Sequence, residues 1–148
     1  MFETLFSLAG TVAMAGWIAL AVTPRHRPVA RPIAIGVAVV LSGLYVALIA
    51  SFWTSGTGDF GSLAGVSRLF THPGLLLAGW VHYLVFDLLV GVWEREEARR
   101  IGLPWWQLVP CLLVTFLFGP MGWLAFLACR HVRLRTRTDI PTAEAPSP

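Results

Sequence analysis

Apolar residues in this chain gather into four long runs, and short polar stretches separate the runs. A transmembrane helix needs about 20 consecutive residues that are mostly apolar, and each run reaches that length. The pattern therefore predicts an all-α fold, an integral membrane bundle of about four transmembrane helices. The predicted spans cover about 4–23, 33–53, 74–93 and 105–129.

The stretch between the second and third runs differs from the other connections. Residues 54–73 are rich in glycine, and within them the sequence FGSLAGVSRLF is modestly amphipathic but too short to cross a membrane. A short interfacial helix is therefore expected between the second and third spans. Residues 94–104, by contrast, are interpreted as a charged turn.

The two ends of the chain carry separate expectations. Residues 1–130 are expected to form a single transmembrane helical domain. The first run is interpreted as a retained span, because its leading residues carry Glu3 and no arginine. Residues 131–148 are basic and then rich in Pro, Ala and Thr, which predicts a disordered tail.

The orientation in the membrane depends on the last run. A single crossing leaves six arginines on one side and five on the other, which is nearly a tie under the positive-inside rule. Because early loops often dominate, both termini are then expected outside. Gly119-Pro120 leaves a second interpretation open, in which the run breaks, re-enters and returns the tail to the arginine-rich side. A single crossing with a kink is the favoured interpretation.

Composition supports a membrane protein and narrows the choice of partners. Hydrophobic residues make up 56% of the 148 residues and charged residues 13%, with a mean hydropathy of +0.70. These values are too apolar for an ordinary soluble domain. All eleven basic residues are arginines in clusters outside the apolar runs, which indicates contact with anionic lipid headgroups. No recognisable nucleic-acid motif occurs, so nucleic acid is not an expected partner.

The two cysteines, Cys111 and Cys129, both fall on the last predicted span. At 1.5 Å per residue, their separation along one helix corresponds to about 27 Å. A disulfide needs Cα atoms within about 7 Å, so such a helix cannot form one. Both cysteines are interpreted as small packing residues.

The third run places two ionisable residues, His82 and Asp87, at membrane depth. A charge at the bilayer centre costs roughly 2.5–3.5 kcal/mol on insertion scales, so such residues usually serve a function. His82 lies about 140° from Asp87 around the helix, so the two cannot touch directly. Asp87 shares its face of the helix with Trp80, Tyr83, Gly91 and Glu94.

Each polar candidate also has a structural explanation. Asp87 could bond a tyrosine or serine of a neighbouring helix, and His82 could donate a hydrogen bond between helices. Glu94 lies at the end of the span beside Arg95 and is expected to be a solvated interfacial charge. Thr115 lies on a stripe of small residues, where it could bond its own backbone or meet Asp87. The functional explanation is favoured for Asp87 and left open for His82.

The same residues do not have the spacing of a metal site. His82, Asp87, Glu94 and His72 do not share one helix face, as the ligands of an H-E-x-x-H or Glu-x-x-His helix do. No phosphate-binding loop, dinucleotide fingerprint, nucleophile elbow or haem-attachment motif occurs. No metal and no cofactor are therefore expected.

Three blocks of sequence, taken in order, resemble one known family. They are LFSLAG…GW…PR, then FGSLAGV…LLAGWVHYLVFDLLVGxWE, then GLPWWxLVPCLLVTFLFGPMGWL. They are similar to the abscisic-acid-deficient-four-like family, with a likeness that extends to about Arg130 and is strongest over 75–122. Members are small multi-span membrane proteins, and the plant members are required for synthesis of the carotenoid neoxanthin.

The resemblance implies an isomerisation that opens the epoxide of violaxanthin and leaves an allene. An acid protonates the epoxide oxygen and a base removes a proton from the polyene side, so no redox cofactor is needed. Under this hypothesis Asp87 is the acid, and His82 or Glu94 is the base. The long apolar substrate enters from the lipid. The candidates for binding it are Trp80, Tyr83, Phe86, Gly91 and Thr115.

A second class of protein suits the same few polar groups. A non-catalytic membrane protein could bind a carotenoid, terpenoid or quinone, or act as a scaffold for an enzyme that modifies one. A transporter is less favoured, because four spans without repeated halves give little room for alternating access. The expected partners are membrane lipids, an isoprenoid or carotenoid ligand, and a carotenoid enzyme or a second copy of the chain. The expected location is a bacterial inner membrane.

Overall fold

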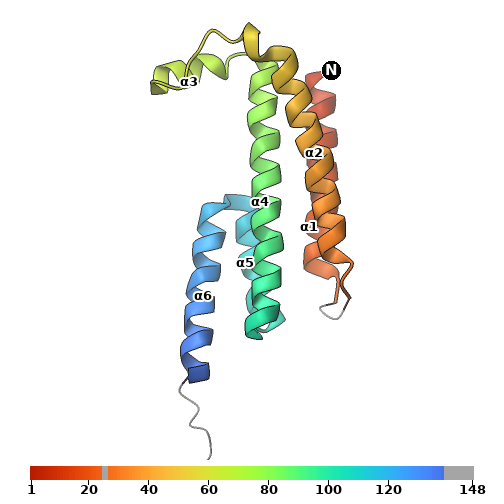
Figure 1. The fold of residues 1–148 in the computed structure, drawn as a ribbon, viewed down its shortest axis with the longest axis vertical. Coiled ribbons are helices and arrows are strands. Elements are labelled where there is room, and N and C mark those ends of the chain that lie inside the picture. Colours follow the sequence, from red (N-terminus) through yellow and green to blue (C-terminus); the bar gives the residue numbers. More distant parts are fainter. Residues whose placement is uncertain (25–26, 139–148) are drawn as a thin grey trace, which may run out of the picture. The chain divides into compact units, whose positions relative to one another are not determined.

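The computed structural model of the chain describes residues 1–24 and 27–138. Every regular element within these ranges is a helix, as Figure 1 shows, and the predicted all-α class is confirmed. The elements are α1 (Phe2–Val22), α2 (Ala30–Phe52), the 3₁₀ turn η1 (Trp53–Ser55), α3 (Leu63–Leu69), α4 (Pro73–Ile101), α5 (Trp105–Phe118) and α6 (Pro120–Thr138).

Three of these helices are long and apolar enough to cross a membrane. They are α1, α2 continued through η1, and α4. Helix α5 is apolar, but its 14 residues extend only about 21 Å, which is less than the roughly 30 Å of a bilayer core. The chain is therefore a helical membrane protein in which three helices meet the length requirement for a span.

The chain divides into two compact units, Met1–Val92 and Trp93–Pro148, and α4 contributes to both. In the first unit, small residues on α1 and α2 recur about one helical turn apart and are buried. Such stripes let helix backbones approach closely in a membrane. Their members are Ala9, Ala13 and Gly16 on α1, and Ala30, Ala34 and Ala38 on α2.

The glycine-rich connection of the first unit contains the short helix that the sequence predicts. Helix α3 begins after Ser62, whose hydroxyl oxygen accepts a hydrogen bond from the Gly65 N–H at 3.0 Å. This is an N-cap, which satisfies a backbone donor left free at the start of a helix. Arg68 at the end of α3 lies 3.7 Å from the Asp59 carboxylate.

The second unit corrects the prediction of a single last span over 105–129. The run is divided into α5 and α6, which lie against each other as a hairpin (Figure 1). Gly119 sits between them with a φ of 42°, a conformation that favours glycine. Pro120 follows, and it cannot donate the hydrogen bond that would continue α5. The chain therefore reverses its direction at Gly119-Pro120, where the sequence allowed either a kink in one crossing helix or a break.

The hairpin also overturns the predicted separation of the two cysteines. The 27 Å estimate assumed one straight helix, whereas the reversal brings Cys111 Sγ on α5 to 3.9 Å from Cys129 Sγ on α6. Both are free thiols, with Cys111 buried and Cys129 half-buried.

Mild oxidation is expected to join Cys111 to Cys129 within one chain. Copper phenanthroline with oxygen should remove two hydrogens per molecule, which mass spectrometry of the intact protein detects as a loss that reductant reverses. A Cys111→Ser variant provides the matched control and should show no such loss. Failure of the wild-type protein to form the bond would indicate a straight span from 105 to 129, since its thiols would lie about 27 Å apart.

Two boundaries also differ from the prediction. Helix α4 continues past the predicted end at 93 to Ile101, so most of the expected charged turn is helical. Helix α6 extends to Thr138, so the first residues of the expected disordered tail are helical too. The rest of that prediction, residues 139–148, lies outside the described residues.

The hairpin changes the expected orientation in the membrane. If α1, α2 and α4 each cross the membrane once and the hairpin does not cross, the number of crossings assigns the loop after α1, the end of α4 and the end of α6 to one side of the membrane. That side carries nine of the arginines in the described part of the chain, and the other side carries Arg68. The nine are Arg27, Arg31, Arg95, Arg99, Arg100, Arg130, Arg133, Arg135 and Arg137. Arg25, one of the six arginines counted on one side from the sequence, lies outside the described residues. The positive-inside rule then favours an outside N-terminus and a cytoplasmic end of α6.

Reporter fusions in a bacterial host should detect this orientation. Green fluorescent protein fused after Thr138 is expected to fluoresce, because it folds in the cytoplasm. Alkaline phosphatase fused at the same point should be inactive, since it needs the periplasm. The opposite pair of results would restore the sequence-based expectation that both termini lie outside.

Candidate functional site

The first unit holds a hydrogen-bonded pair of polar residues on α4, Tyr83 and Asp87. Four residues separate them, so one turn of helix sets both side chains on the same face. The Tyr83 hydroxyl donates a hydrogen bond to the Asp87 carboxyl group. The carboxyl oxygen Oδ2 is buried and has no hydrogen-bond partner among the described residues. An unsatisfied buried carboxyl oxygen is costly, which marks Asp87 as a candidate for contact with a ligand.

Aromatic rings extend from Tyr83 toward the beginning of α4. The Trp80 ring lies 5.5 Å from the Tyr83 ring and 5.3 Å from the ring of Phe6 on α1. A hollow of about 330 Å³ opens beside Phe6 and Trp80, and its lining also includes Glu3. Trp80 is 39% exposed, so its ring remains partly available. The pair therefore adjoins a row of aromatic rings against which a flat apolar molecule can lie.

His82 faces a different flank of α4. Its ring lies 4.5 Å from Phe86 and 5.7 Å from Tyr45 of α2, and the residue is exposed. This agrees with the 140° offset expected from the sequence. The structure therefore brings Phe86 together with His82 and does not bring His82 to the Tyr83–Asp87 pair.

Gly91 packs against a neighbouring helix. A Cβ atom added to Gly91 would lie 2.7 Å from Cζ3 of Trp17 on α1. Of the two uses that a small residue offers here, a close helix contact or space for a ligand, the structure has the first. Trp17 is buried, so its ring fills the space that Gly91 leaves.

Glu94 and Thr115 belong to the second unit, where they pair with each other. The expectation that Glu94 is a solvated interfacial charge is wrong, because its exposed fraction is 0%. For Thr115 the sequence predicts a bond to the backbone of its own helix or a contact with Asp87. The Thr115 hydroxyl instead donates a hydrogen bond to Glu94 Oε1 at 2.8 Å. Gly122 of α6 makes this packing feasible, since an added Cβ would overlap the backbone and hydroxyl of Thr115.

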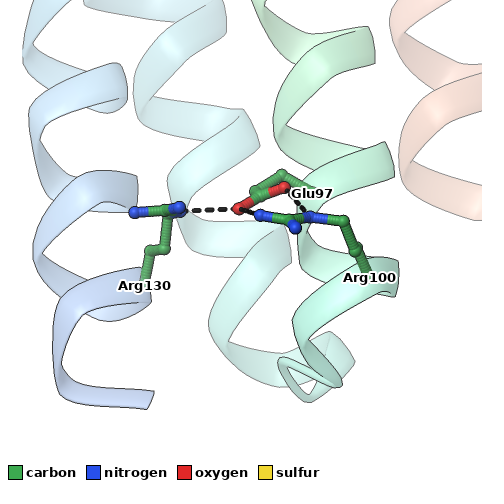
Figure 2. Close-up of polar contacts among 3 residues, drawn as sticks. All are labelled: Glu97, Arg100 and Arg130. Atoms are coloured by element: carbon green, nitrogen blue, oxygen red, sulfur yellow. Dashed lines mark hydrogen bonds and ion pairs between the residues drawn. The ribbon is translucent and has the colours of Figure 1, made fainter. Parts of the chain in front are cut away.

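A second carboxylate of this unit, Glu97 of α4, binds two arginines, one on α4 and one on α6 (Figure 2). Arg100 donates to both Glu97 oxygens, at 2.7 and 2.8 Å, and Arg130 of α6 donates to Oε1 at 2.6 Å. The Glu97–Arg100 contact is an i, i+3 helix pair that a helical interpretation of 94–101 would have found. The contact with Arg130 had no sequence signal, because it depends on the hairpin.

The tryptophans near the end of α4 contact other side chains of the second unit. Trp93 meets the buried ring of Phe126 edge-on at 5.3 Å, and the Arg95 guanidinium lies 5.2 Å from the centre of the Trp105 ring. These contacts give Trp93 an aromatic packing partner and add a cation–π interaction at Trp105.

Within the described ranges, no three His, Cys, Asp or Glu side chains come together in a group that could hold a metal ion. The functional candidate of the first unit is therefore the Tyr83–Asp87 pair with its aromatic row. It offers a hydroxyl, a carboxyl oxygen without a protein partner, and an apolar surface. Such a set can transfer a proton to or from an apolar ligand.

Comparison with known proteins gives one family match. The model of a family described as ABA DEFICIENT 4-like matches residues 4–126. No curated protein and no solved structure matches the chain. The matched residues include all of the candidates named above on α4 and α5.

Proposed function

The chain belongs to the ABA DEFICIENT 4-like family, and we propose that it acts in carotenoid or isoprenoid metabolism as a cofactor-free membrane isomerase of an epoxycarotenoid. The observation that carries this proposal is the Asp87 carboxyl group. One of its oxygens is buried without a partner, while Tyr83 supplies a hydrogen bond to the group. A neutral carboxyl group in an apolar setting is the kind of acid that opening an epoxide needs.

The substrate in this proposal approaches from the lipid and lies along the aromatic row of Phe6, Trp80 and Tyr83. The ring spacings of 5.3 and 5.5 Å provide a continuous apolar surface for a conjugated chain. The polar end group of the carotenoid then lies at Asp87. Rotation about the last side-chain torsion of aspartate is soft, so either carboxyl oxygen can turn toward the ligand.

The same carboxyl group can serve first as acid and then as base. Asp87 gives its proton to the epoxide oxygen, the carbon–oxygen bond breaks, and positive charge spreads along the polyene. The carboxylate then takes the proton from the adjacent polyene carbon, and the electron pair of that C–H bond forms the second double bond of the allene. Atoms and electrons balance, because the proton lost at the start is regained at the end. Tyr83 stabilises the carboxylate between the two steps by its hydrogen bond.

This proposal differs from the sequence-based hypothesis in the identity of the base. His82 contacts the rings of Tyr45 and Phe86 on another flank of α4. Glu94 is buried in the second unit against Thr115. The two carbons that react are neighbours in the substrate, so one carboxyl group can reach both of them. His82 and Glu94 therefore have no proton transfer in the proposed reaction.

The proposed location is the inner membrane of a bacterium. Apolar helices are the usual spanning elements of such membranes, whereas outer-membrane proteins of bacteria close as strand barrels. The three long helices support this choice between the two membranes.

Identification of bound pigment tests whether the protein handles a carotenoid at all. The full chain is purified in mild detergent from membranes that make epoxycarotenoids, and its pigment is identified by absorbance and mass spectrometry. A stoichiometric epoxide or allene supports the proposal. A colourless protein that keeps its thermal unfolding midpoint would contradict it and favour a scaffold. A bound pigment that the protein never alters would favour a non-catalytic binder.

A further inference from the structure

The two helices of the hairpin enclose a groove that the proposed reaction does not use. Its volume is about 860 Å³, which is within the range of small-molecule sites. The walls are mainly apolar side chains of α5 and α6, and both cysteines of the chain lie among them. The lining on α6 extends from Ala125 to Thr136, about 16 Å at 1.5 Å per residue, which matches one acyl chain of a leaflet that is roughly 15 Å deep.

The polar residues of this groove are gathered at one end. Near the turn at Gly119 the lining is apolar, with Val114 and Ala125. At the open end of the hairpin the lining includes Gln107 from α5 and Arg133 from α6. The Arg133 guanidinium lies 3.8 Å from the place where a Cβ of Gly102 would be, which sets it beside the connection between α4 and α5. The groove therefore suits a molecule with an apolar tail and a polar head.

The charges at the open end specify an anionic head. The sequence has no acidic residue from 98 to 138. Helix α5 has no charged residue, and the formal charges of α6 are all arginines. Arg130 is engaged by Glu97, whereas no carboxylate among the described residues forms an ion pair with Arg133. The same end of the hairpin belongs to the arginine-rich side, which faces the anionic cytoplasmic leaflet under the three-span topology.

We propose that this groove binds an anionic phospholipid. One acyl chain lies between α5 and α6 against the two cysteines, and the headgroup phosphate lies at Arg133, with the Gln107 amide as a further donor. A zwitterionic phospholipid carries an ammonium group that the arginines of this end repel, so the site prefers a headgroup with net negative charge. The inference does not depend on the proposed isomerase activity, because no pigment takes part.

Trp106 supplies a direct reporter of occupancy, since it lines the groove and is 71% exposed. The full chain is reconstituted into phosphatidylcholine nanodiscs that contain phosphatidylglycerol, with bromine on the acyl chains of either lipid. Bromine quenches indole fluorescence on contact. The difference in fluorescence quenching between the wild type and Trp106→Phe isolates the signal of Trp106 from that of the other six tryptophans.

Brominated phosphatidylglycerol is expected to quench Trp106 with about fivefold higher relative affinity than brominated phosphatidylcholine. Arg133→Gln should reduce this preference to near unity. The matched control is Arg99→Gln, which removes the same charge from the same unit at an exposed position that does not line the groove. Ala128→Phe keeps every charge but fills the groove, so it should weaken quenching by both lipids.

Three results would overturn the proposal. Equal quenching of the wild-type protein by the two lipids would show that the groove has no headgroup preference. An equal loss in Arg99→Gln and Arg133→Gln would show attraction to the surface as a whole. Shielding of Trp106 from both lipids, with a cross-linked dimer, would show that a second copy of the chain fills the groove.

Discussion

Replacing Asp87 with asparagine is expected to lower the conversion of an epoxycarotenoid at least 100-fold, the scale of one general acid–base group. Asparagine keeps the shape of the side chain but can neither give a proton to the epoxide oxygen nor take one from the polyene. The rate of allene formation by the purified protein, measured in a single turnover, provides the comparison. An unchanged thermal unfolding midpoint in the variant assigns the loss to chemistry and not to folding.

The two tyrosines of the chain provide a matched pair of variants for the same site. Tyr83→Phe removes the hydrogen bond to Asp87 and should slow conversion about 10-fold, which is what one hydrogen bond to a charged group contributes. Tyr45→Phe keeps the ring contact with His82 and should convert at the wild-type rate. His82→Phe should stay within about threefold of the wild type. Full activity in the Asp87 variant would remove Asp87 as the acid under either assignment. Inactivity in the His82 variant would restore His82 as the base of the sequence-based assignment.

Replacing Gly122 with alanine is expected to open the hairpin of the second unit. The added methyl group would overlap the backbone nitrogen, Cα and hydroxyl of Thr115, and a backbone cannot move aside as a flexible side chain can. Overpacking of this kind costs about 1–3 kcal/mol and sometimes more, and the burial of Glu94 depends on the same contact. We expect a loss of at least about 3 kcal/mol of unfolding free energy, measured by titration with denaturing detergent.

The yield of the Cys111–Cys129 bond reports the geometry of the same variant. It should fall sharply in Gly122→Ala, because the two thiols separate when α6 moves away from α5. Gly43→Ala is the matched control, since an added Cβ at Gly43 meets nothing within 4 Å. The Gly43→Ala substitution should leave the free energy of unfolding unchanged or raise it slightly, because alanine has a higher helix propensity than glycine. A wild-type bond yield in Gly122→Ala would contradict the close packing of α5 and α6.

The long helices could be predicted from the sequence because a membrane span is recognised from a continuous run of apolar residues. Helices α1 and α2 begin and end within a few residues of the apolar runs, and α3 was visible as a short amphipathic segment. The Tyr83–Asp87 pair was accessible too, because a four-residue offset on a helix sets two side chains on one face. These features depend on neighbouring residues alone.

The contacts of the hairpin could not be predicted, because they join residues that are distant in sequence. Gly119-Pro120 signalled a break, but proline is also tolerated within a crossing helix, so the local pattern fits both outcomes. Every contact across the reversal depends on that choice. Cys111 with Cys129, Glu94 with Thr115 and Glu97 with Arg130 follow from the turn and from nothing local.

The central claim, that this membrane protein is a cofactor-free isomerase of an epoxycarotenoid, is tested most directly by the mass of the product. The purified wild-type chain in nanodiscs is mixed with an equimolar epoxycarotenoid and no other reagent, and the pigment is separated after one turnover. We predict a new pigment of identical mass that shows the infrared stretch of an allene. Recovery of unchanged substrate from a protein that binds it, or a product of different mass, would contradict the claim.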